Sequence, residues 1–259
     1  MNIFFAINDN YVTPLAVALT SILENTNKDL HFFILQKNLS DASKSKISNL
    51  IKCYFNANVE YIDIDSKLFA NFESKIDYIS QESYFRYLIP QLKPNLDKAL
   101  YLDADLVVIK DISELYETKI EDNYCAGVRD LFINKYKEKI GLSLTDLYIN
   151  SGVMLLNCKK IREDNMVDEL LKNNHKYKEV AYFQDQDIIN ITFKGKIKEI
   201  DSIYNFATFD IKNNFEKSKD AVIVHFTGEF KPWLPNCWNK LKHLWDYYLD
   251  VYNKKTIDK

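Results

Sequence analysis

Short apolar runs alternate along this chain with segments in which apolar residues recur at helical spacing. Ile3 to Ile7 is an apolar run that ends at Asn8. Leu15, Leu19 and Ile22 then recur every three or four residues. An apolar run of this length predicts a buried strand, whereas the wider spacing predicts a helix with one buried face. The chain is therefore predicted to open with a strand, a loop and a helix.

The same alternation continues toward the C-terminus. Thr13 suits the N-cap of the first predicted helix with Pro14 at its first position, and Ser40 suits the N-cap of a second. A short helix is predicted from Ser83 and another over 185–191. Further buried strands are predicted at 30–35, 59–64, 98–102, 106–109, 123–128, 153–156 and 221–224. Strands that alternate with helices indicate an α/β fold with a mainly parallel central sheet flanked by helices.

The domain organisation is predicted from the absence of any linker-like segment. We expect one main domain over residues 1–240, with an insertion near 129–150. Residues 241–259 are predicted to form an amphipathic helix and tail. Its apolar face would consist of Leu244, Trp245, Tyr248 and Leu249.

Composition narrows the class of protein. The 259 residues carry a formal net charge of −3, with lysines scattered among acids, which argues against a nucleic-acid partner. The cysteines show no zinc-binding spacing. The N-terminus lacks the basic residues of a secretory signal, and no apolar run approaches the ~20 residues of a membrane span. The absence of a secretory signal favours a reducing compartment. We therefore expect a cytoplasmic protein.

Two acids follow the strand predicted at 98–102. Asp103 and Asp105 are separated by the small Ala104, and alternate side chains of an extended chain point to the same side. Two adjacent carboxylates repel each other in the absence of a cation. This pair is therefore a candidate divalent-metal site, although a bare D-x-D motif is also compatible with a solvated acidic turn.

A second polar group follows the strand predicted at 221–224. His225 ends this strand, and imidazole is a common ligand for manganese and other transition metals. Gly228 would permit close approach of a ligand, and Lys231 would supply a positive charge for a phosphate. The alternative for His225 is a hydrogen-bonded histidine with a structural role only.

Two further polar groups adjoin apolar segments. Asp185 and Gln186 open a predicted helix, where either helix capping or contact with sugar hydroxyls would explain them. Asn150, Ser151 and Gly152 precede a predicted strand, where an ordinary turn or a close contact with a ligand would explain them.

These groups, taken in order, resemble glycosyltransferase family 8, and most closely its bacterial lipooligosaccharide galactosyltransferases. The resemblance runs from Ile3 to about Trp233. Each segment alone is weakly specific, but the order and spacing of the whole series are specific. The matching segments are Ala6-Ile7-Asn8-Asp9-Asn10-Tyr11, Tyr84-Phe85-Arg86, Leu100-Tyr101-Leu102-Asp103-Ala104-Asp105, Asp130-Leu131-Phe132, Asn150-Ser151-Gly152-Val153, Gln184-Asp185-Gln186-Asp187, His225-Phe226-Thr227-Gly228 and Lys231-Pro232-Trp233.

The resemblance implies a GT-A fold, the Rossmann-like fold of nucleotide-diphospho-sugar transferases, for the catalytic domain at 1–240. It implies a retaining transfer of galactose or glucose from a UDP-hexose donor, with Mn²⁺ as the cofactor and Mg²⁺ as an alternative. The acceptor would be a saccharide or glycolipid of a cell-surface glycan or lipooligosaccharide. The sequence does not choose between the two sugars, and the acceptor depends on the loops at 70–80 and 129–149.

The resemblance also assigns roles to individual residues. The metal ligands would be Asp103, Asp105 and His225. The uridine would contact Ala6, Asn8 and Asn10, with Ala104 near the ribose. The diphosphate and sugar would contact Arg86, Gly228 and Lys231. The sugar would be lined by Asn150, Ser151, Gly152, Asp185 and Gln186. Asp185 and Gln186 would lie beside the anomeric carbon, and Asp130 would face the acceptor.

The chain departs from the family pattern in two places. Family members often carry aspartate where this chain has Asn8, which puts the selectivity for uracil in doubt. The tail lacks the dense basic and aromatic extension that attaches relatives to membranes, and Lys254 and Lys255 are a weak substitute. Weak peripheral association with the inner face of the cell membrane is thus a hypothesis, which a liposome flotation assay without binding to anionic lipid would contradict.

Three alternatives stay open at this point. A phosphohydrolase of the haloacid-dehalogenase type also places D-x-D after an apolar strand, but normally on an early strand, whereas several strand–helix units precede Asp103 here. A self-glucosylating primer of the glycogenin kind would need an acceptor tyrosine near its own site, and the chain has 17 tyrosines. A non-catalytic nucleotide-sugar binding module is the third alternative.

Overall fold

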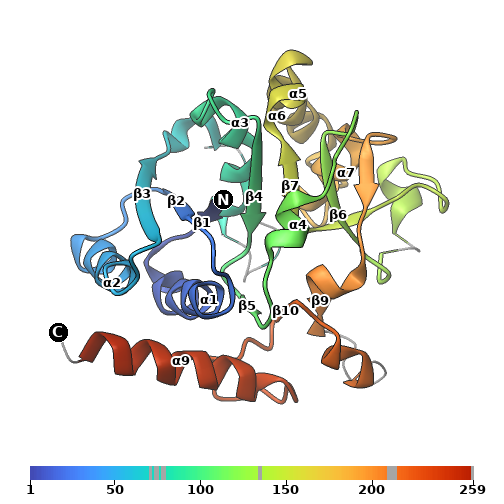
Figure 1. The fold of residues 1–259 in the computed structure, drawn as a ribbon. Coiled ribbons are helices and arrows are strands. Elements are labelled where there is room, and N and C mark those ends of the chain that lie inside the picture. The colour runs from blue at the N-terminus through green and yellow to red at the C-terminus, as the bar shows by residue number, and fades with distance from the viewer. Residues whose placement is uncertain (70–71, 73–75, 77–79, 134–135, 209–214, 258–259) are drawn as a thin grey trace.

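A large mixed sheet forms the centre of the molecule (Figure 1). The computed structural model describes residues 1–259 except 70–71, 73–75, 77–79, 134–135, 209–214 and 258–259. The strands of this sheet, in spatial order, are β3 (Ala57–Asp63), β2 (Leu30–Gln36), β1 (Asn2–Ala6), β4 (Lys98–Leu102), β7 (Ile149–Asn157), β6 (Cys125–Arg129) and β8 (Ile197–Glu199). The first four are mutually parallel, as are β6 and β8, whereas β7 runs antiparallel to both of its neighbours.

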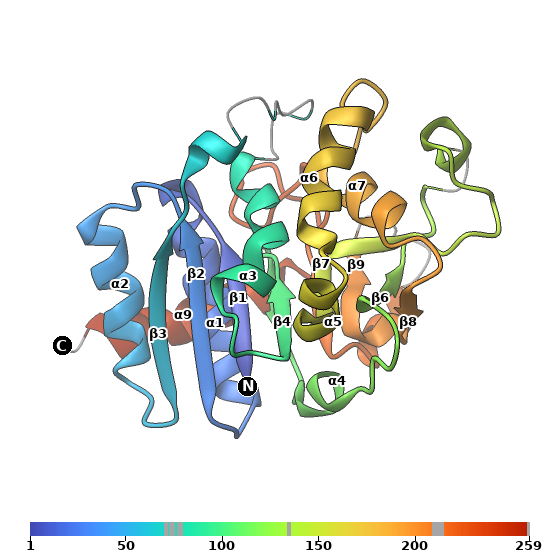
Figure 2. The ribbon, with the colours of Figure 1, turned by 90° about the horizontal axis from the view of Figure 1, so that it is seen from above.

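Helices cover both faces of the large sheet (Figures 1 and 2). The side chains of β1 alternate between the two faces, so that Ile3 and Phe5 pack on one side and Phe4 on the other. One face packs against α1 (Val12–Asn25) and α2 (Asp41–Ile51). The other face is covered by the 3-10 helix η3 (Gln81–Leu88) and by α3 (Ile89–Leu92), α5 (Cys158–Glu163), α6 (Met166–Tyr177) and α7 (Asp185–Thr192). Among the remaining described helices are α4 (Ser113–Glu117), η1 (Asp9–Tyr11), η2 (Ser66–Phe69), η4 (Lys137–Ile140), η5 (Ser202–Asn205) and η7 (Phe215–Lys219).

A small second sheet lies beside the end of β4. It is formed by β5 (Leu106–Val108), β10 (Ile223–His225) and β9 (Phe206–Ala207), with β10 antiparallel to β5 and parallel to β9. After β4 the chain bends at residues 103–105 and enters the small sheet. The junction between the two sheets therefore carries the D-x-D motif.

The C-terminal helix α9 (Lys242–Ile257) packs across α1 (Figure 1). Its residues Trp245 and Tyr248 are buried in a cluster with Val17 of α1 and Val224 of β10. The apolar face predicted for this helix is thus used for packing within the molecule. Among the described residues, no helix combines the length and the apolar character that crossing a bilayer requires.

The α/β fold with a mainly parallel sheet is confirmed, and Ser40 caps α2 by accepting from Ser43 N as predicted. The prediction of Thr13 as an N-cap is wrong. The 3-10 helix η1 leads directly into α1, which begins at Val12, so that Thr13 lies inside the helix and Pro14 in its first turn. All four cysteines, Cys53, Cys125, Cys158 and Cys237, are free.

Of the two explanations given for Asn150, Ser151 and Gly152, the ordinary turn does not hold. These residues belong to β7, which begins at Ile149, four residues earlier than its apolar run at Val153. The pairing of β7 with β4 extends the strand through this polar segment, since Asp103 N donates to Gly152 O at 2.8 Å. The strand therefore holds these three residues beside the D-x-D motif.

Candidate active site

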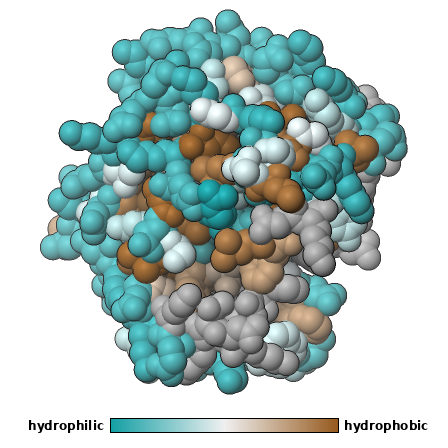
Figure 3. Space-filling model, turned by 90° about the vertical axis from the view of Figure 1, so that its right-hand side faces the viewer, coloured by the Kyte–Doolittle hydropathy of each residue, from teal (hydrophilic) through white to brown (hydrophobic). Residues whose placement is uncertain are grey.

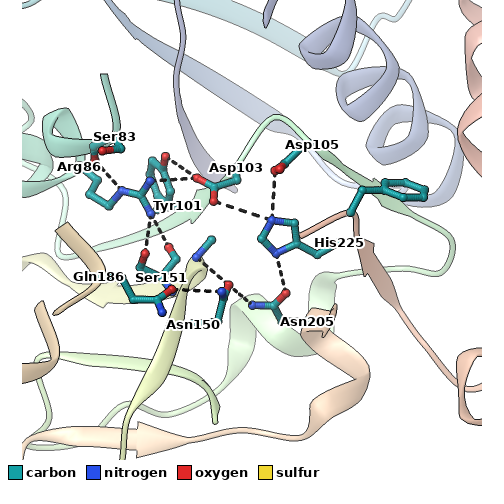
Figure 4. Close-up of polar contacts among 12 residues, drawn as sticks. Ser83, Arg86, Tyr101, Asp103, Asp105, Asn150, Ser151, Gln186, Asn205 and His225 are labelled. Atoms are coloured by element: carbon teal, nitrogen blue, oxygen red, sulfur yellow. Dashed lines mark hydrogen bonds and ion pairs between the residues drawn. The ribbon is translucent and has the colours of Figure 1, made fainter. Parts of the chain in front are cut away.

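A cavity of about 440 Å³ lies where β1 and β4 end and β7 begins. Polar residues from both sheets line it, and Figure 4 shows many of their contacts. The predicted site residues that line it are Ala6, Arg86, Asp103, Ala104, Asp105, Asp130, Asn150, Ser151, Asp185, Gln186, His225, Gly228 and Lys231. Asn8, Asn10 and Gly152 are not among its lining residues but lie next to residues that are.

Asp103, Asp105 and His225 converge at the junction of the two sheets. His225 ends β10 and pairs with Leu106 of β5, directly after the two aspartates. One ligand atom from each of the three side chains lies within 4.8 Å of the others. The strand-alternation argument for the aspartates is wrong, because both lie in the bend after β4 and neither is in a strand. The bend itself directs both carboxylates toward His225.

Asn205 and Asn150 fix the orientation of the His225 ring (Figure 4). The Gly152 N–H donates to Asn150 Oδ1 at 3.0 Å, so Asn205 presents its amide nitrogen to the same oxygen at 2.9 Å. Asn205 Oδ1 then faces His225 Nδ1 at 2.9 Å, which places the proton of a neutral ring on Nδ1. Nε2 therefore directs its lone pair toward the two aspartates, with the nearer carboxylate oxygen 3.0 Å away. This arrangement favours a cation between the three side chains.

Gly152 leaves the space that the candidate metal ligands occupy. A Cβ at this position would lie 2.3 Å from His225 Cε1 and 2.6 Å from Asp103 Oδ2. Only glycine therefore allows both side chains to approach the strand. Two carboxylates and one imidazole form a donor set typical of manganese and other transition metals, and less usual for magnesium. The residues thus fit the metal that the resemblance implies.

Lys231 is buried against the candidate metal site. Its ammonium group forms an ion pair with Asp105 and donates to Phe226 O at 2.9 Å. Burial alone would raise the pKa of the Asp105 carboxyl, but the positive charge of the neighbouring Lys231 is the main effect that outweighs burial and holds this pKa well below its usual range. Gly228, on the same loop, lines the cavity with a φ of 84°, a conformation that favours glycine.

Arg86 joins both acidic parts of the site, and Figure 4 shows its contacts with Asp103 and Ser151. It is buried, with Nη2 at 3.0 Å from Asp103 Oδ1 and Nε at 3.2 Å from Asp185 Oδ2. Nη1 donates to Ser151 O at 2.7 Å, and the guanidinium lies 4.2 Å from the centre of the Tyr101 ring. Burial raises the pKa of Asp185, and Arg86 opposes this effect. Arg86 therefore compensates the charge of two carboxylates, of which Asp185 is buried and Asp103 is partly exposed.

Gln186 is held by hydrogen bonds on both sides of its amide. Its Oε1 accepts from Asn150 Nδ2 and from Ser151 N, each at 3.1 Å. Its Nε2 donates to Tyr148 OH at 3.2 Å and to Asp130 Oδ2 at 3.3 Å. The structure thus brings together the predicted sugar-lining residues and the predicted acceptor residue around one amide.

Asp187 supports the hydrogen bonds around Gln186 through the Tyr148 hydroxyl, which contacts both residues. It is fully buried and accepts hydrogen bonds from Tyr148 OH at 2.6 Å, Tyr136 OH at 2.9 Å and Phe183 N at 2.8 Å. Because the Tyr148 hydroxyl donates to Asp187, its oxygen is left to accept from Gln186. Burial raises the pKa of Asp187 to about 6, although the three hydrogen bonds oppose this effect.

The raised pKa of Asp187 predicts a pH dependence of stability. An acid whose pKa is raised by folding stabilises the folded state below its ordinary pKa, and this contribution is lost as the pH rises through about 6. Between about pH 4.5 and pH 7, we expect the free energy of unfolding of the wild type to fall by roughly 2 kcal/mol relative to that of Asp187→Asn. Urea unfolding at both pH values measures this difference. Parallel pH profiles for the two proteins would contradict the raised pKa of Asp187.

The predicted uridine-binding residues lie at one end of the cavity. Ala6 ends β1 and lines the cavity together with Tyr11. Asn8 lies between them and caps η1, since its Oδ1 accepts from Asn10 N at 3.1 Å. Its Nδ2 donates to Glu82 Oε2 at 3.1 Å. This end of the cavity is thus formed where the loop after β1 meets the first turn of η3.

Known proteins resemble this chain over nearly its whole length. The family model described as Glycosyl transferase family 8 matches residues 2–237. The chain belongs to this family. A relative in Haemophilus influenzae, provisionally described as a glycosyltransferase, is 34% identical over 98% of this chain and 79% of its own length. A lipopolysaccharide 1,2-glucosyltransferase of Escherichia coli is 29% identical over 97% of this chain and 78% of its own length.

A solved structure supports the same assignment. The galactosyltransferase LgtC, in complex with donor and acceptor sugar analogues, is 28% identical and has a TM-score of 0.87, covering 97% of this chain and 96% of that one. The family 8 membership and the GT-A fold predicted from the sequence are thereby confirmed. Family 8 membership makes the protein a glycosyltransferase, which excludes the phosphohydrolase alternative.

The structure adds residues to this family 8 site that the sequence motifs did not indicate. Asn205 contacts His225, Tyr148 contacts Gln186, and the Tyr101 hydroxyl donates to Asp103 Oδ1 at 2.8 Å. Tyr101 belongs to the matching segment around the D-x-D motif, but its position in a predicted buried strand indicated only that it would pack in the core. Asn205 and Tyr148 had no signal in the sequence, because their importance depends on contacts with residues distant in the chain.

Proposed function

We propose that this protein is a metal-dependent retaining hexosyltransferase that moves galactose or glucose from a UDP-sugar to a saccharide acceptor. The observation that carries the proposal is the convergence of Asp103, Asp105 and His225 at a cavity of about 440 Å³. The charged residues Arg86 and Lys231 and the amide of Gln186 line the same cavity. This arrangement suits a diphosphate beside the three candidate metal ligands and a sugar beside Gln186.

Asp103, Asp105 and His225 would hold the metal, with Mn²⁺ as the proposed ion and Mg²⁺ as the alternative. When bound there, a divalent ion supplies positive charge where the sugar–phosphate bond breaks and negative charge develops on UDP. Lys231 would stabilise the same leaving group, because its ammonium group lies beside Asp105 at the cavity wall. Gly228 would let the backbone of this loop approach the diphosphate.

The sugar would lie against Asn150, Ser151 and Gln186. Asp185 is paired with Arg86, with Nε 3.2 Å from Oδ2, which lowers its nucleophilicity. The amide of Gln186 is itself a poor nucleophile. We therefore favour attack of the acceptor hydroxyl on the same face that UDP leaves, with a departing phosphate oxygen taking the hydroxyl proton, over a covalent sugar–enzyme intermediate.

The acceptor would bind on the side of Asp130 and the segment between β6 and β7. Burial raises the pKa of Asp130, whose Oδ2 accepts from Gln186. Figure 3 shows apolar residues gathered toward the middle of the face on this side of the molecule. The large apolar side chains exposed near Asp130 and before α7 are Leu131, Phe132, Leu144, Val180 and Tyr182. Most of the 70–80 loop, which was also predicted to select the acceptor, lies outside the described residues.

A lipooligosaccharide or other cell-surface glycan is the proposed acceptor class, in line with the lipopolysaccharide glucosyltransferase among the relatives. A cytoplasmic location, with weak peripheral association at the inner membrane face, stays a prediction from the sequence. The packing of Trp245 and Tyr248 against the body of the molecule leaves mainly Lys254, Lys255 and the exposed Tyr247 for such an association.

The proposal predicts metal-dependent release of UDP in the absence of any acceptor. We expect UDP-galactose or UDP-glucose to be hydrolysed slowly with Mn²⁺, and Asp103→Asn or a chelator to reduce the rate by about 100-fold or more. A coupled UDP assay measures the rate, and the faster donor identifies the sugar. Asp122→Asn, an exposed acid bound to Lys196, is the control and should match the wild type. An Asp103→Asn rate equal to that of the wild type would contradict the proposed metal site.

A further inference from the structure

Asn8 occupies a position where family members often carry aspartate, and its contacts fix how its amide is oriented. The Asn10 N–H is a donor only, so the oxygen of the Asn8 amide must face it, at 3.1 Å. The amide nitrogen therefore points to Glu82, with Nδ2 at 3.1 Å from Oε2. The side chain at position 8 thus presents a donor where the aspartate of relatives would present an acceptor.

Glu82 of η3 places a carboxylate beside the amide nitrogen of Asn8. It lies in the first turn of η3 and is partly exposed, like Asn8. Ser80 and Ser83 beside it line the cavity, as do Ala6 and Tyr11 on the side of Asn8. The Asn8–Glu82 pair therefore joins the two segments that form this end of the cavity.

The pair matches the edge of a uracil ring. Uracil presents one N–H donor between two carbonyl acceptors, whereas cytosine presents an unprotonated ring nitrogen beside an amino group. A carboxylate accepts strongly from the uracil N–H, and it repels the lone pair of the cytosine nitrogen. The Asn8 nitrogen carries two hydrogens, of which the bond to Glu82 uses one, and the second suits a uracil carbonyl.

We propose that Glu82 reads the imide N–H of uracil, and so supplies the carboxylate that relatives often carry at position 8. Asn8 orients Glu82 and donates to the adjacent uracil carbonyl. Glu82 is thereby a specificity-determining residue. Its carboxylate, 74 positions along the chain from Asn8, would provide the uracil selectivity that the Asn8 amide cannot provide alone. This inference rests on the proposed function, since it requires that a uridine diphosphate binds in this cavity.

Calorimetric titration with UDP and CDP in the presence of manganese tests the inference without an acceptor. The two ligands differ only in the edge of the base. We expect the wild type to prefer UDP over CDP by at least about 10-fold, and Glu82→Gln to lose about 10-fold in UDP affinity and to bind CDP at least as tightly as the wild type does, because the repelling carboxylate is gone. The double variant Asn8→Asp, Glu82→Gln returns the carboxylate to position 8 and should restore the preference. Asp9→Asn, an exposed acid bound to Ser40, is the matched control and should leave both affinities unchanged.

The outcomes separate this inference from the proposed function. If the wild type binds UDP tightly and Glu82→Gln keeps the wild-type ratio of UDP to CDP affinity, the role of Glu82 is wrong and the proposed function stands. A double variant that fails to recover UDP preference, while its thermal unfolding matches that of the wild type, also counts against Glu82. A wild type that binds neither ligand would overturn both the proposed function and this inference.

Discussion

Gly152→Ala is expected to lower the affinity for manganese and the rate of UDP release by about 100-fold. The new methyl group would lie 2.3 Å from His225 Cε1 and 2.6 Å from Asp103 Oδ2, closer than carbon atoms approach in proteins. Either the histidine ring or the aspartate must therefore move, and the three proposed ligands can no longer share one ion. Titration with manganese, followed by the donor-hydrolysis assay, measures both effects.

Gly195→Ala is the matched control for this variant. Gly195 has a φ of 76°, and apart from its chain neighbours no described residue has an atom within 4 Å of the position that a methyl group would take, so alanine there strains the backbone but meets no other side chain. It should cost about 1 kcal/mol of stability and leave manganese affinity unchanged. Wild-type manganese affinity in Gly152→Ala would show that His225 and Asp103 do not form the metal site in the proposed arrangement.

Arg86→Met is expected to be the most destabilising change in the site, by about 3–5 kcal/mol. The substitution keeps much of the side-chain volume but leaves Asp103 and the buried Asp185 without their cation. It also leaves the Ser151 carbonyl without a donor that lies 2.7 Å away in the wild type. Urea unfolding of the wild type and the variant at neutral pH measures the difference.

Arg129→Met provides the comparison for a surface ion pair. Arg129 bonds Glu199 through both Nε and Nη2, but both side chains are substantially exposed. Such a pair contributes about 1 kcal/mol or less. A loss of stability in Arg86→Met as small as that in Arg129→Met would mean that water compensates Asp103 and Asp185 once the guanidinium is gone.

The order of elements and the D-x-D motif could be predicted from the sequence because both depend on short segments. Ile3 to Ile7 and Lys98 to Leu102 are apolar enough to require burial, and Asp103 directly follows such a strand. The approach of His225 to this motif came from the family resemblance alone. Its physical cause is the antiparallel pairing of β5 with β10 across more than a hundred residues, which no local pattern specifies.

Local patterns also failed where tertiary pairing overrides them. Asn150 and Ser151 are polar and favour a turn, yet they extend β7 because β4 and β6 supply partners for the strand. Asn205 precedes the two-residue strand β9, and its hydrogen bond to His225 exists only once the small sheet has formed. The metal ligands could thus be predicted from sequence motifs, whereas the residues that orient these ligands could not.

The cations that line the cavity already have acidic partners. Among the described lining residues, Arg86 is paired with Asp103 and Asp185, Lys231 with Asp105, and Arg129 with Glu199. A diphosphate entering alone would have to compete with these carboxylates for positive charge. An ion bound to Asp103 and Asp105 would relieve that competition, so donor and metal should each raise the affinity for the other by the same factor. Because the carboxylates neutralise these cations in the absence of ligands, the nucleotide and the ion are expected to bind cooperatively and not independently.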